Sequence, residues 1–331
     1  MNAALARRRT LPAGAVIETR VMADGWHLRS AVWQGREGGP GSILFLTGRG
    51  DFLEKYAETF HDLVDAGWGV ATFDWRGQGL SGRLGDMPMK GHTADFDVWL
   101  RDLDTVIGWF QSVLPRPWFG IGHSLGGHLL LRHLAGENNE FARAVLLAPM
   151  LGVSARPLGA PLARRIARLM TAFGRGGAYV WRGGPYVPGT AGSVRQVLLT
   201  SDPERYVDEG WWTTQNPALA LGSVTWGWLA AAFASLDALL KPPARLRGTG
   251  EGADTRPRLQ RITTPVLVLV PKSDGLVDGD ITRDAVSRMP SATLEVVAAD
   301  GVEVGHELLR EASGIRAQVL ARVTGFLQET P

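Results

Sequence analysis

The chain has 331 residues, enough to bury a large hydrophobic core and long for a single domain. It contains no cysteine, which excludes disulfides, thiolate metal sites and a cysteine nucleophile. The formal net charge is only +2, so neither charge nor motif favours a nucleic-acid partner. No run approaches the roughly 20 apolar residues that span a bilayer, and the longest candidate, residues 224–240, is interrupted by Asp237.

Three consecutive arginines, Arg7 to Arg9, stand near the start of the chain. A secretory signal needs an apolar stretch after its basic residues, and none follows here. We therefore expect a cytoplasmic protein and interpret the arginines as a solvated tail.

Strand-like and helix-like patterns alternate over residues 1–150. Residues 16–21 and 26–33 predict a hairpin around the sequence Ala-Asp-Gly at 23–25. Strands joined by helices through short loops are typical of a parallel, doubly wound sheet, so we expect an α/β fold. The further elements expected in this block are strands at 42–47, 69–74, 118–121 and 144–148 and helices at 52–66, 93–114 and 127–134.

The alternation stops over residues 151–261, which are rich in Gly, Pro, Arg and Trp. It returns with the apolar run 265–270, typical of a fully buried strand. A helix (281–289), a strand (292–297) and a helix (315–327) are expected after it. We therefore predict an α/β-hydrolase core of residues 1–150 and 262–331, with residues 151–261 inserted as a helical cap.

Residues 122–127 read Gly-His-Ser-Leu-Gly-Gly, between the apolar run 118–121 and a helical pattern. A serine on such a strand-to-helix turn is held in a strained backbone conformation with its hydroxyl exposed above the sheet. Glycine is needed at Gly122 and Gly126 because a side chain there would collide with the neighbouring strand or helix. The alternative is a glycine-rich turn with an incidental serine, which would not require an apolar strand before it and a helix after it. Ser124 is the predicted nucleophile.

A serine hydroxyl needs a base to take its proton and a carboxylate to orient that base. On this type of turn the chain order is serine, acid, histidine. Asp274 follows the buried strand 265–270, and His306 is the only histidine after it. We predict the triad Ser124, Asp274 and His306, with Asp278 and Asp300 as rival acids.

Three nearby histidines have simpler interpretations. His123 adjoins the serine and is expected to support it without taking its proton. His128 and His133 fall on the following helix and are interpreted as packed or surface residues.

The transition state of acyl transfer carries a negatively charged oxygen, the oxyanion, which backbone N–H groups must stabilise. One donor should be the residue after the nucleophile, Leu125. The other should come from the loop 47–50, which reads Thr-Gly-Arg-Gly, and we assign it to the N–H of Arg49. The Arg49 guanidinium could reach a substrate phosphate, but solvent exposure is the default expectation.

Four motifs occur in order: Thr-Gly-Arg-Gly at 47–50, Asp-Trp-Arg-Gly-Gln-Gly-Leu-Ser at 74–81, the serine motif at 122–127 and His-Glu at 306–307. With them the chain resembles the monoacylglycerol lipase and lysophospholipase branch of the α/β hydrolases, often labelled serine aminopeptidase-like. Members usually have histidine where Thr47 stands, a position that donates nothing to the oxyanion. Residues 199–206 and 216–228 resemble the insertion of bacterial lysophospholipase-type proteins.

The predicted cap is unusually basic and partly very apolar. It holds 14 Lys and Arg against 7 Asp and Glu. This indicates either an arginine-rich solvated surface or a segment that meets an anionic membrane or a phosphate-bearing substrate. Residues 224–240 are too apolar for a solvated helix. We expect Trp226, Trp228 and Phe233 to bind an acyl chain over the serine, while ordinary packing of cap against core is compatible with that role.

These observations favour a serine esterase without cofactor or metal, acting on a lysophospholipid or monoacylglycerol through an acyl-enzyme. Peripheral contact of the cap with an anionic membrane is expected as well. The same triad also serves general carboxylesterases, thioesterases, lactonases, peptidases and acyltransferases, and these remain alternatives. A non-catalytic ligand-binding protein on this fold is disfavoured by the ordered triad.

Overall fold

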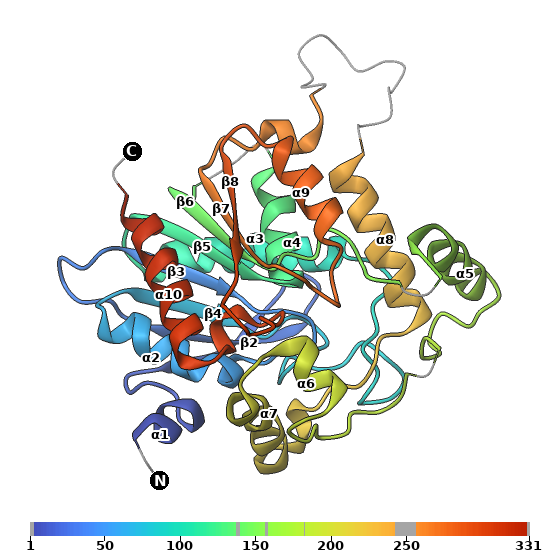
Figure 1. Ribbon diagram of the computed structural model, residues 1–331, viewed down its shortest axis with the longest axis horizontal. Helices are drawn as coiled ribbons and strands as arrows, with labels where there is room; N and C mark the ends of the chain where they lie inside the picture. The colour runs from blue at the N-terminus through green and yellow to red at the C-terminus, as the bar shows by residue number, and fades with distance from the viewer. Residues whose placement is uncertain (1–2, 137–139, 156–157, 182, 242–255, 330–331) are drawn as a thin grey trace.

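An eight-stranded sheet forms the centre of the molecule (Figure 1). The computed structural model describes residues 3–136, 140–155, 158–181, 183–241 and 256–329. The strand order is β1-β2-β4-β3-β5-β6-β7-β8, and only the β1–β2 and β2–β4 pairs are antiparallel. The predicted hairpin and mostly parallel sheet are thus confirmed. The strands are β1 Val16–Val21, β2 His27–Trp33, β3 Ser42–Leu46, β4 Gly69–Phe73, β5 Trp118–His123, β6 Arg143–Leu147, β7 Val266–Pro271 and β8 Ala292–Val297.

The central strands are apolar along their whole length because helices cover both faces of the sheet. Every residue of β3, β4 and β7 is buried, whereas most of the edge strand β1 is exposed. Continuous apolar strands are typical of parallel sheets covered on both sides. The carboxyl ends of β3, β5 and β7 therefore point to one edge, and the predicted site residues follow these ends.

Two separate hydrophobic clusters lie on the two faces of the sheet. Helices α2 (Ala57–Asp65) and α10 (Ser313–Gln328) contribute to one cluster. Helices α3 (Asp97–Val113), α4 (Leu125–Leu134) and α9 (Gly279–Ser287) contribute to the other. The fold therefore has the helix–sheet–helix layers that the alternating pattern predicts.

Two predicted helices have different limits in the structure. The predicted helix 93–114 begins only at Asp97, because Thr93 and Asp95 accept hydrogen bonds from backbone N–H groups two residues on and form turns. The predicted helix 52–66 is divided into the 3-10 turn η1 (Leu53–Tyr56) and α2.

The interpretation of Arg7 to Arg9 as a solvated tail is wrong. These residues end the short helix α1 (Ala3–Arg9), and their guanidinium groups pair with carboxylates of α2 and α7. Arg7 lies 2.8 Å from Asp62, and Arg8 lies 2.7 Å from Asp208. The arginines therefore bind α1 to the core and to the inserted segment.

The segment between β6 and β7 is helical. Its elements are α5 Ala160–Ala172, α6 Val194–Leu199, α7 Pro203–Gln215, η2 Pro217–Leu219, α8 Trp226–Leu240 and η3 Arg258–Arg261. Parts of the predicted cap, residues 156–157, 182 and 242–255, lie outside the described residues. The division into core and cap at 151 and 261 stays a prediction. No helix in the described ranges is long and apolar enough to cross a membrane.

Candidate active site

The turn at Ser124 joins β5 to α4 and has the predicted strain. Ser124 has φ 50° and ψ −111°, a left-handed conformation that side chains rarely adopt. A Cβ at Gly122 would lie 2.7 Å from the Gly127 backbone, and one at Gly126 would lie 2.4 Å from the carbonyl oxygen of Leu46. Only glycine fits at either position, which places the serine at the positive end of α4.

The structure brings Asp274 and His306 together. His306 Nδ1 donates to Asp274 Oδ2 at 2.6 Å, while Asp274 Oδ1 accepts from the N–H groups of Leu276 and Val277. Burial opposes ionisation of this carboxyl, but the hydrogen bond and charge of His306 and the two N–H donors outweigh it. They hold the pKa of Asp274 below its ordinary value. The pair can therefore hold one imidazole tautomer with Nε2 free to accept a proton.

Neither rival acid takes this position. The Asp278 side chain accepts from the N–H groups of Asp280 and Ile281 and thereby begins α9. Asp300 is exposed at the end of a turn after β8.

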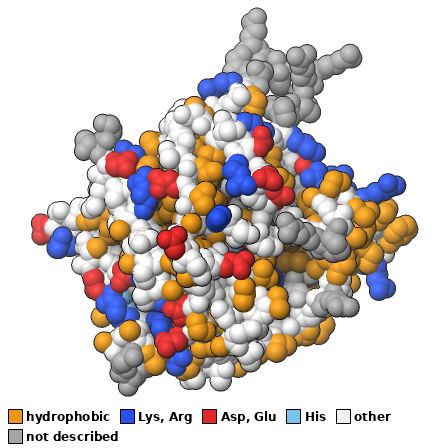
Figure 2. All heavy atoms as spheres, viewed as in Figure 1, with side chains coloured by type: hydrophobic (Ala, Val, Ile, Leu, Met, Phe, Trp, Pro, Cys, Tyr) orange, Lys and Arg blue, Asp and Glu red, His pale blue; other side chains and the backbone are white. Residues whose placement is uncertain are grey.

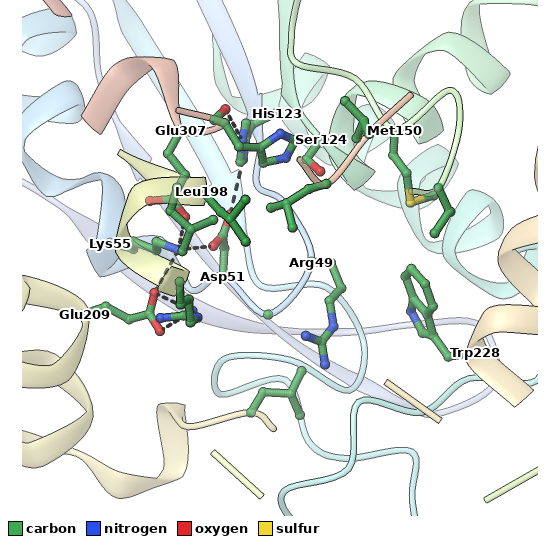
Figure 3. A pocket seen from close by; sticks show the side chains of 18 residues that line it. Arg49, Asp51, Lys55, His123, Ser124, Met150, Leu198, Glu209, Trp228 and Glu307 are labelled. Atoms are coloured by element: carbon green, nitrogen blue, oxygen red, sulfur yellow. Dashed lines mark hydrogen bonds and ion pairs between the residues drawn. The ribbon is translucent and has the colours of Figure 1, made fainter. Parts of the chain in front are cut away.

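Ser124 and His306 line one cavity of about 290 Å³ (Figure 3). One part of its wall is apolar and includes Met150, Val153, Leu198, Leu221, Trp228 and Val277. Another part is charged and consists of Arg49, Asp51, Lys55, Arg195, Glu209 and Glu307. Figure 3 shows Met150 and Trp228 on one side and Lys55 and Glu209 on the other. The cavity can accept a ligand that is apolar at one end and polar at the other.

The two predicted oxyanion donors lie on the segments that adjoin Ser124. Leu125 is the first residue of α4, and Arg49 lies in the loop after β3 and lines the cavity. The loop is fixed because the N–H of Gly48 donates to Asp51 Oδ2 at 2.8 Å, and a Cβ at Gly48 would lie 2.7 Å from His123 Nδ1. The roles of both N–H groups stay predictions.

The Arg49 side chain is not a solvated surface group. Its guanidinium enters the cavity, its Nη2 donates to the carbonyl oxygen of Gly222, and its Nε is buried without a hydrogen-bond partner. Burial, and next the charge of Arg195, lower the pKa of Arg49 to about 10. The default expectation of solvent exposure is therefore wrong, because the segment 221–223 packs over this residue.

A buried charge cluster lies next to the serine, and the sequence did not reveal it. Lys55 Nζ lies 2.6 Å from Asp51, 3.0 Å from Glu209 and 2.6 Å from Glu307. Burial opposes the charged form of Lys55, but the three carboxylates outweigh it and raise its pKa. The cluster joins the loop after β3, helix α7 and the residue after His306. The only sequence signal for it was the His-Glu pair at 306–307.

The His306 loop is also held by the inserted segment. The N–H of His306 donates to the carbonyl of Leu198 at 3.0 Å, and the N–H of Glu307 donates to that of Leu199 at 2.7 Å. A Cβ at Gly305 would lie 2.5 Å from the Leu199 backbone. The position of the predicted base therefore depends on the end of α6.

The other histidines on these elements have structural partners. His123 Nδ1 lies 2.7 Å from the Tyr56 hydroxyl, and its Nε2 lies 3.4 Å from the carbonyl oxygen of His306. His128 is buried against Ser235 at 2.7 Å, and burial lowers its pKa to about 3. His133 pairs with Asp104 on α3.

The three predicted acyl-binding residues have different surroundings. Trp228 lines the Ser124 cavity, but Trp226 and Phe233 are not among its lining residues. Trp226 packs on Trp181, with ring centroids 4.9 Å apart, and Phe233 lies under the Arg164 guanidinium. Helix α8 is mostly buried and packs against α5, so packing within the inserted segment explains these two side chains.

The loop 74–81 supports the site from below. The buried Asp74 accepts from the N–H groups of Leu53 and Leu80, and a Cβ at Gly79 would lie 2.1 Å from its carboxyl group. Arg76 is paired with Asp102 at 2.7 Å. These contacts give the motif a structural role. None of its residues lines the Ser124 cavity.

An eight-stranded, mostly parallel sheet with a serine on the turn after β5 defines an α/β hydrolase. The family model described as serine aminopeptidase, S33, matches residues 40–313. The chain therefore belongs to this family, and it is an enzyme that hydrolyses carboxylic esters.

Known proteins with similar sequences and structures agree with this assignment. Lysophospholipase L2 of Escherichia coli is 28% identical over 304 residues, which cover 86% of this chain and 79% of that protein. The probable lysophospholipase L2 of Haemophilus influenzae is 26% identical over 287 residues, covering 86% and 83%. A soluble variant of monoglyceride lipase from Saccharomyces cerevisiae, solved with a substrate analog, superposes with a TM-score of 0.71 at 17% identity, covering 97% of each chain.

The charge cluster leads to a prediction about acid stability. Burial opposes ionisation of Glu209, but Lys55, Arg195 and Arg310 outweigh it and lower its pKa to about 2, from an ordinary value of 4.5. A carboxyl with a lowered folded-state pKa adds stability above its unfolded pKa and loses it as the pH falls through the folded value. Glu209→Gln should therefore lower the free energy of unfolding by about 3 kcal/mol at pH 7. Urea unfolding should show this difference shrinking between pH 4.5 and 2.

Glu204→Gln is the matched control on the same helix. The Glu204 side chain is 76% exposed and pairs with Arg8 at 3.1 Å, so its replacement should change stability little at any pH. A Glu209→Gln effect that stays constant into acid contradicts the role given to the cluster.

Proposed function

We propose that this enzyme hydrolyses the ester bond of monoacyl lipids, lysophospholipids or monoacylglycerols, through an acyl-enzyme on Ser124. The observation that carries the proposal is that His306, which is hydrogen-bonded to Asp274, lines the same cavity as the strained Ser124. The names of the relatives, lysophospholipase and monoglyceride lipase, support the choice of substrate.

The proposed reaction has two steps, and in each of them His306 takes up one proton and gives it back. Ser124 Oγ attacks the ester carbonyl while His306 Nε2 takes its proton, and the tetrahedral intermediate collapses as His306 returns that proton to the leaving alcohol. Water then attacks the acyl carbonyl while His306 takes its proton, and the second tetrahedral intermediate releases the fatty acid as His306 returns the proton to Ser124 Oγ. Asp274 keeps the imidazole oriented and stabilises its charged form. The N–H groups of Arg49 and Leu125 stabilise the oxyanion in both steps.

The apolar wall of the cavity accounts for the preference for an acyl chain. Trp228, Leu198 and Val277 contribute to this wall. Each methylene transferred from water contributes about 0.8 kcal/mol, so even a short chain gains useful affinity. The inserted helices then act as a cap that keeps the chain away from water.

Replacing the nucleophile tests this proposal directly. Ser124→Ala should lower ester turnover by about 10³-fold or more and abolish covalent labelling by a fluorophosphonate probe, since no other group can form the acyl-enzyme. Turnover of lysophosphatidylglycerol and monoacylglycerol by the purified variant is the measurement, and circular dichroism controls for folding. Undiminished turnover would rule out Ser124 as the nucleophile.

We further propose that α5 rests on an anionic membrane surface. Its outer face carries exposed Leu162, Leu169 and Phe173, the last 78% exposed, beside exposed Arg165 and Arg168. Figure 2 shows apolar and basic side chains together at the edge of the molecule where α5 lies. An amphipathic helix with apolar side chains flanked by arginines is typical of helices that lie in the membrane interface. The surplus of positive charge in the cap is thereby assigned to a defined surface, the outer face of α5.

Vesicle flotation tests this surface. The double variant Leu169→Ser, Phe173→Ser should reduce binding to phosphatidylglycerol vesicles about tenfold or more, because it removes two large apolar contacts with the interface. High salt should weaken binding of the wild type as well, by screening the arginines. Val21→Ser on the edge strand β1, which is 62% exposed, is the control. Equal loss of binding in the control variant contradicts a role for α5.

A further inference from the structure

Every charged side chain that lines the Ser124 cavity, apart from His306, has an ion-pair partner except one. Three carboxylates, those of Asp51, Glu209 and Glu307, are each within ion-pair distance of a cation. The cations that pair with them are Lys55, Arg195 and Arg310. Asp274 is engaged by His306 and does not line this cavity. Arg49 is the cation left over.

Arg49 has only a neutral partner. Its Nη2 donates to the carbonyl oxygen of Gly222, and its Nε is buried without a partner. Among the residues that the structure describes, no carboxylate oxygen lies within 4.0 Å of its guanidinium. A partly buried cation without a counter-charge is costly, and a bound anion would remove that cost. Burial and the Arg195 charge both lower the pKa of Arg49, which an anion between them would reverse.

The position of Arg49 defines which anion fits. Its backbone N–H is the proposed oxyanion donor, and its side chain extends from there into the cavity (Figure 3). An anion bound by the guanidinium therefore belongs to the same molecule as the ester carbonyl, a few bonds away. In a lysophospholipid the phosphate lies at this kind of separation, across the glycerol. A guanidinium fork suits phosphate oxygens, and a phosphodiester carries one negative charge with which Arg49 can pair.

We infer that the Arg49 guanidinium is a phosphodiester subsite, which makes lysophospholipids the preferred substrates over monoacylglycerols. This inference rests on the proposed function and narrows its substrate class. It predicts that Arg49 contributes to one substrate and not to the other, whereas a purely structural tie to Gly222 would serve both alike.

The test compares lysophosphatidylglycerol with monoacylglycerol of the same acyl chain, both in neutral detergent micelles, so that membrane charge plays no part. The quantity measured is the ratio of kcat/KM for the two substrates. Arg49→Gln should lower this ratio about tenfold or more, mainly through KM for the phospholipid, since a charge-assisted hydrogen bond is lost. Arg49→Lys keeps the charge without the fork and should lower the ratio less. Titration with a fluorophosphonate gives the concentration of active Ser124 in each preparation.

Arg83→Gln is the matched control. Arg83 also donates to backbone carbonyls, those of Gly79 at 2.8 Å and Ala220 at 3.2 Å, but it does not line the cavity. Its replacement should leave the substrate ratio unchanged. If the ratio in Arg49→Gln equals that of the wild type while Ser124 is still labelled, the subsite is wrong and the esterase proposal stands. If labelling is lost in the wild type, the proposed function itself fails.

The head group alone gives a second readout. Glycerophosphoglycerol should inhibit monoacylglycerol hydrolysis by the wild type and inhibit Arg49→Gln much less. Equal inhibition of both proteins would overturn the subsite. Inorganic phosphate at the same concentration should inhibit weakly, and inhibition as strong as that by the diester would assign the site to free phosphate.

Discussion

The left-handed backbone at Ser124 is the constraint on which the rest of the site depends. A non-glycine residue in this conformation costs about 1–3 kcal/mol, and the surrounding structure must impose it. Gly122 and Gly126 allow β5, α4 and the end of β3 to approach so closely that no relaxed turn fits between them. The N–H of Ser124 is held by the carbonyl of Leu147 on β6, which fixes the turn against the sheet. The Ser124 hydroxyl therefore has a defined position at the edge of the sheet, and the other groups of the site are placed relative to it.

The groups around Ser124 are held by electrostatics more than by apolar packing. Lys55 joins Asp51, Glu209 and Glu307, which lie on three segments far apart in the sequence. Buried ion pairs add little net stability compared with apolar side chains of the same size, because desolvation is costly. Their value here is positional, since a charged network tolerates one arrangement of the oxyanion loop, α7 and the His306 loop.

Much of the fold followed from the sequence because parallel strands and amphipathic helices have strong local patterns. The strand β7 is apolar at every position, and the serine motif specifies its own turn. His306 could be proposed from chain order, and Asp274 from its place after β7 with Asp278 and Asp300 as rivals. The structure places His306 Nδ1 2.6 Å from Asp274 Oδ2. Local pattern carries less information where contacts are long-range.

The residues that sequence reasoning missed or misplaced all depend on such contacts. Lys55 is an ordinary lysine in a helical pattern until α7 brings Glu209 beside it. Arg49 is partly buried beneath residues 221–223, and Arg7 and Arg8 pair with carboxylates that α2 and α7 supply. Phe233 has the apolar side chain expected of an acyl-binding residue, but it lies against Arg164. The insertion lacks the alternation of strands and helices. Contacts between its segments therefore cannot be derived from the sequence of either segment alone.

In the proposed reaction, Ser124, His306 and the N–H groups of Arg49 and Leu125 all act on the same ester carbonyl group. A crystal structure of the protein inhibited by a long-chain alkyl fluorophosphonate tests this most directly. We expect phosphorus bonded to Ser124 Oγ, with its phosphoryl oxygen about 3 Å from both backbone nitrogens and the alkyl chain along Trp228. A phosphoryl oxygen directed away from both nitrogens, or an adduct on another residue, contradicts the account.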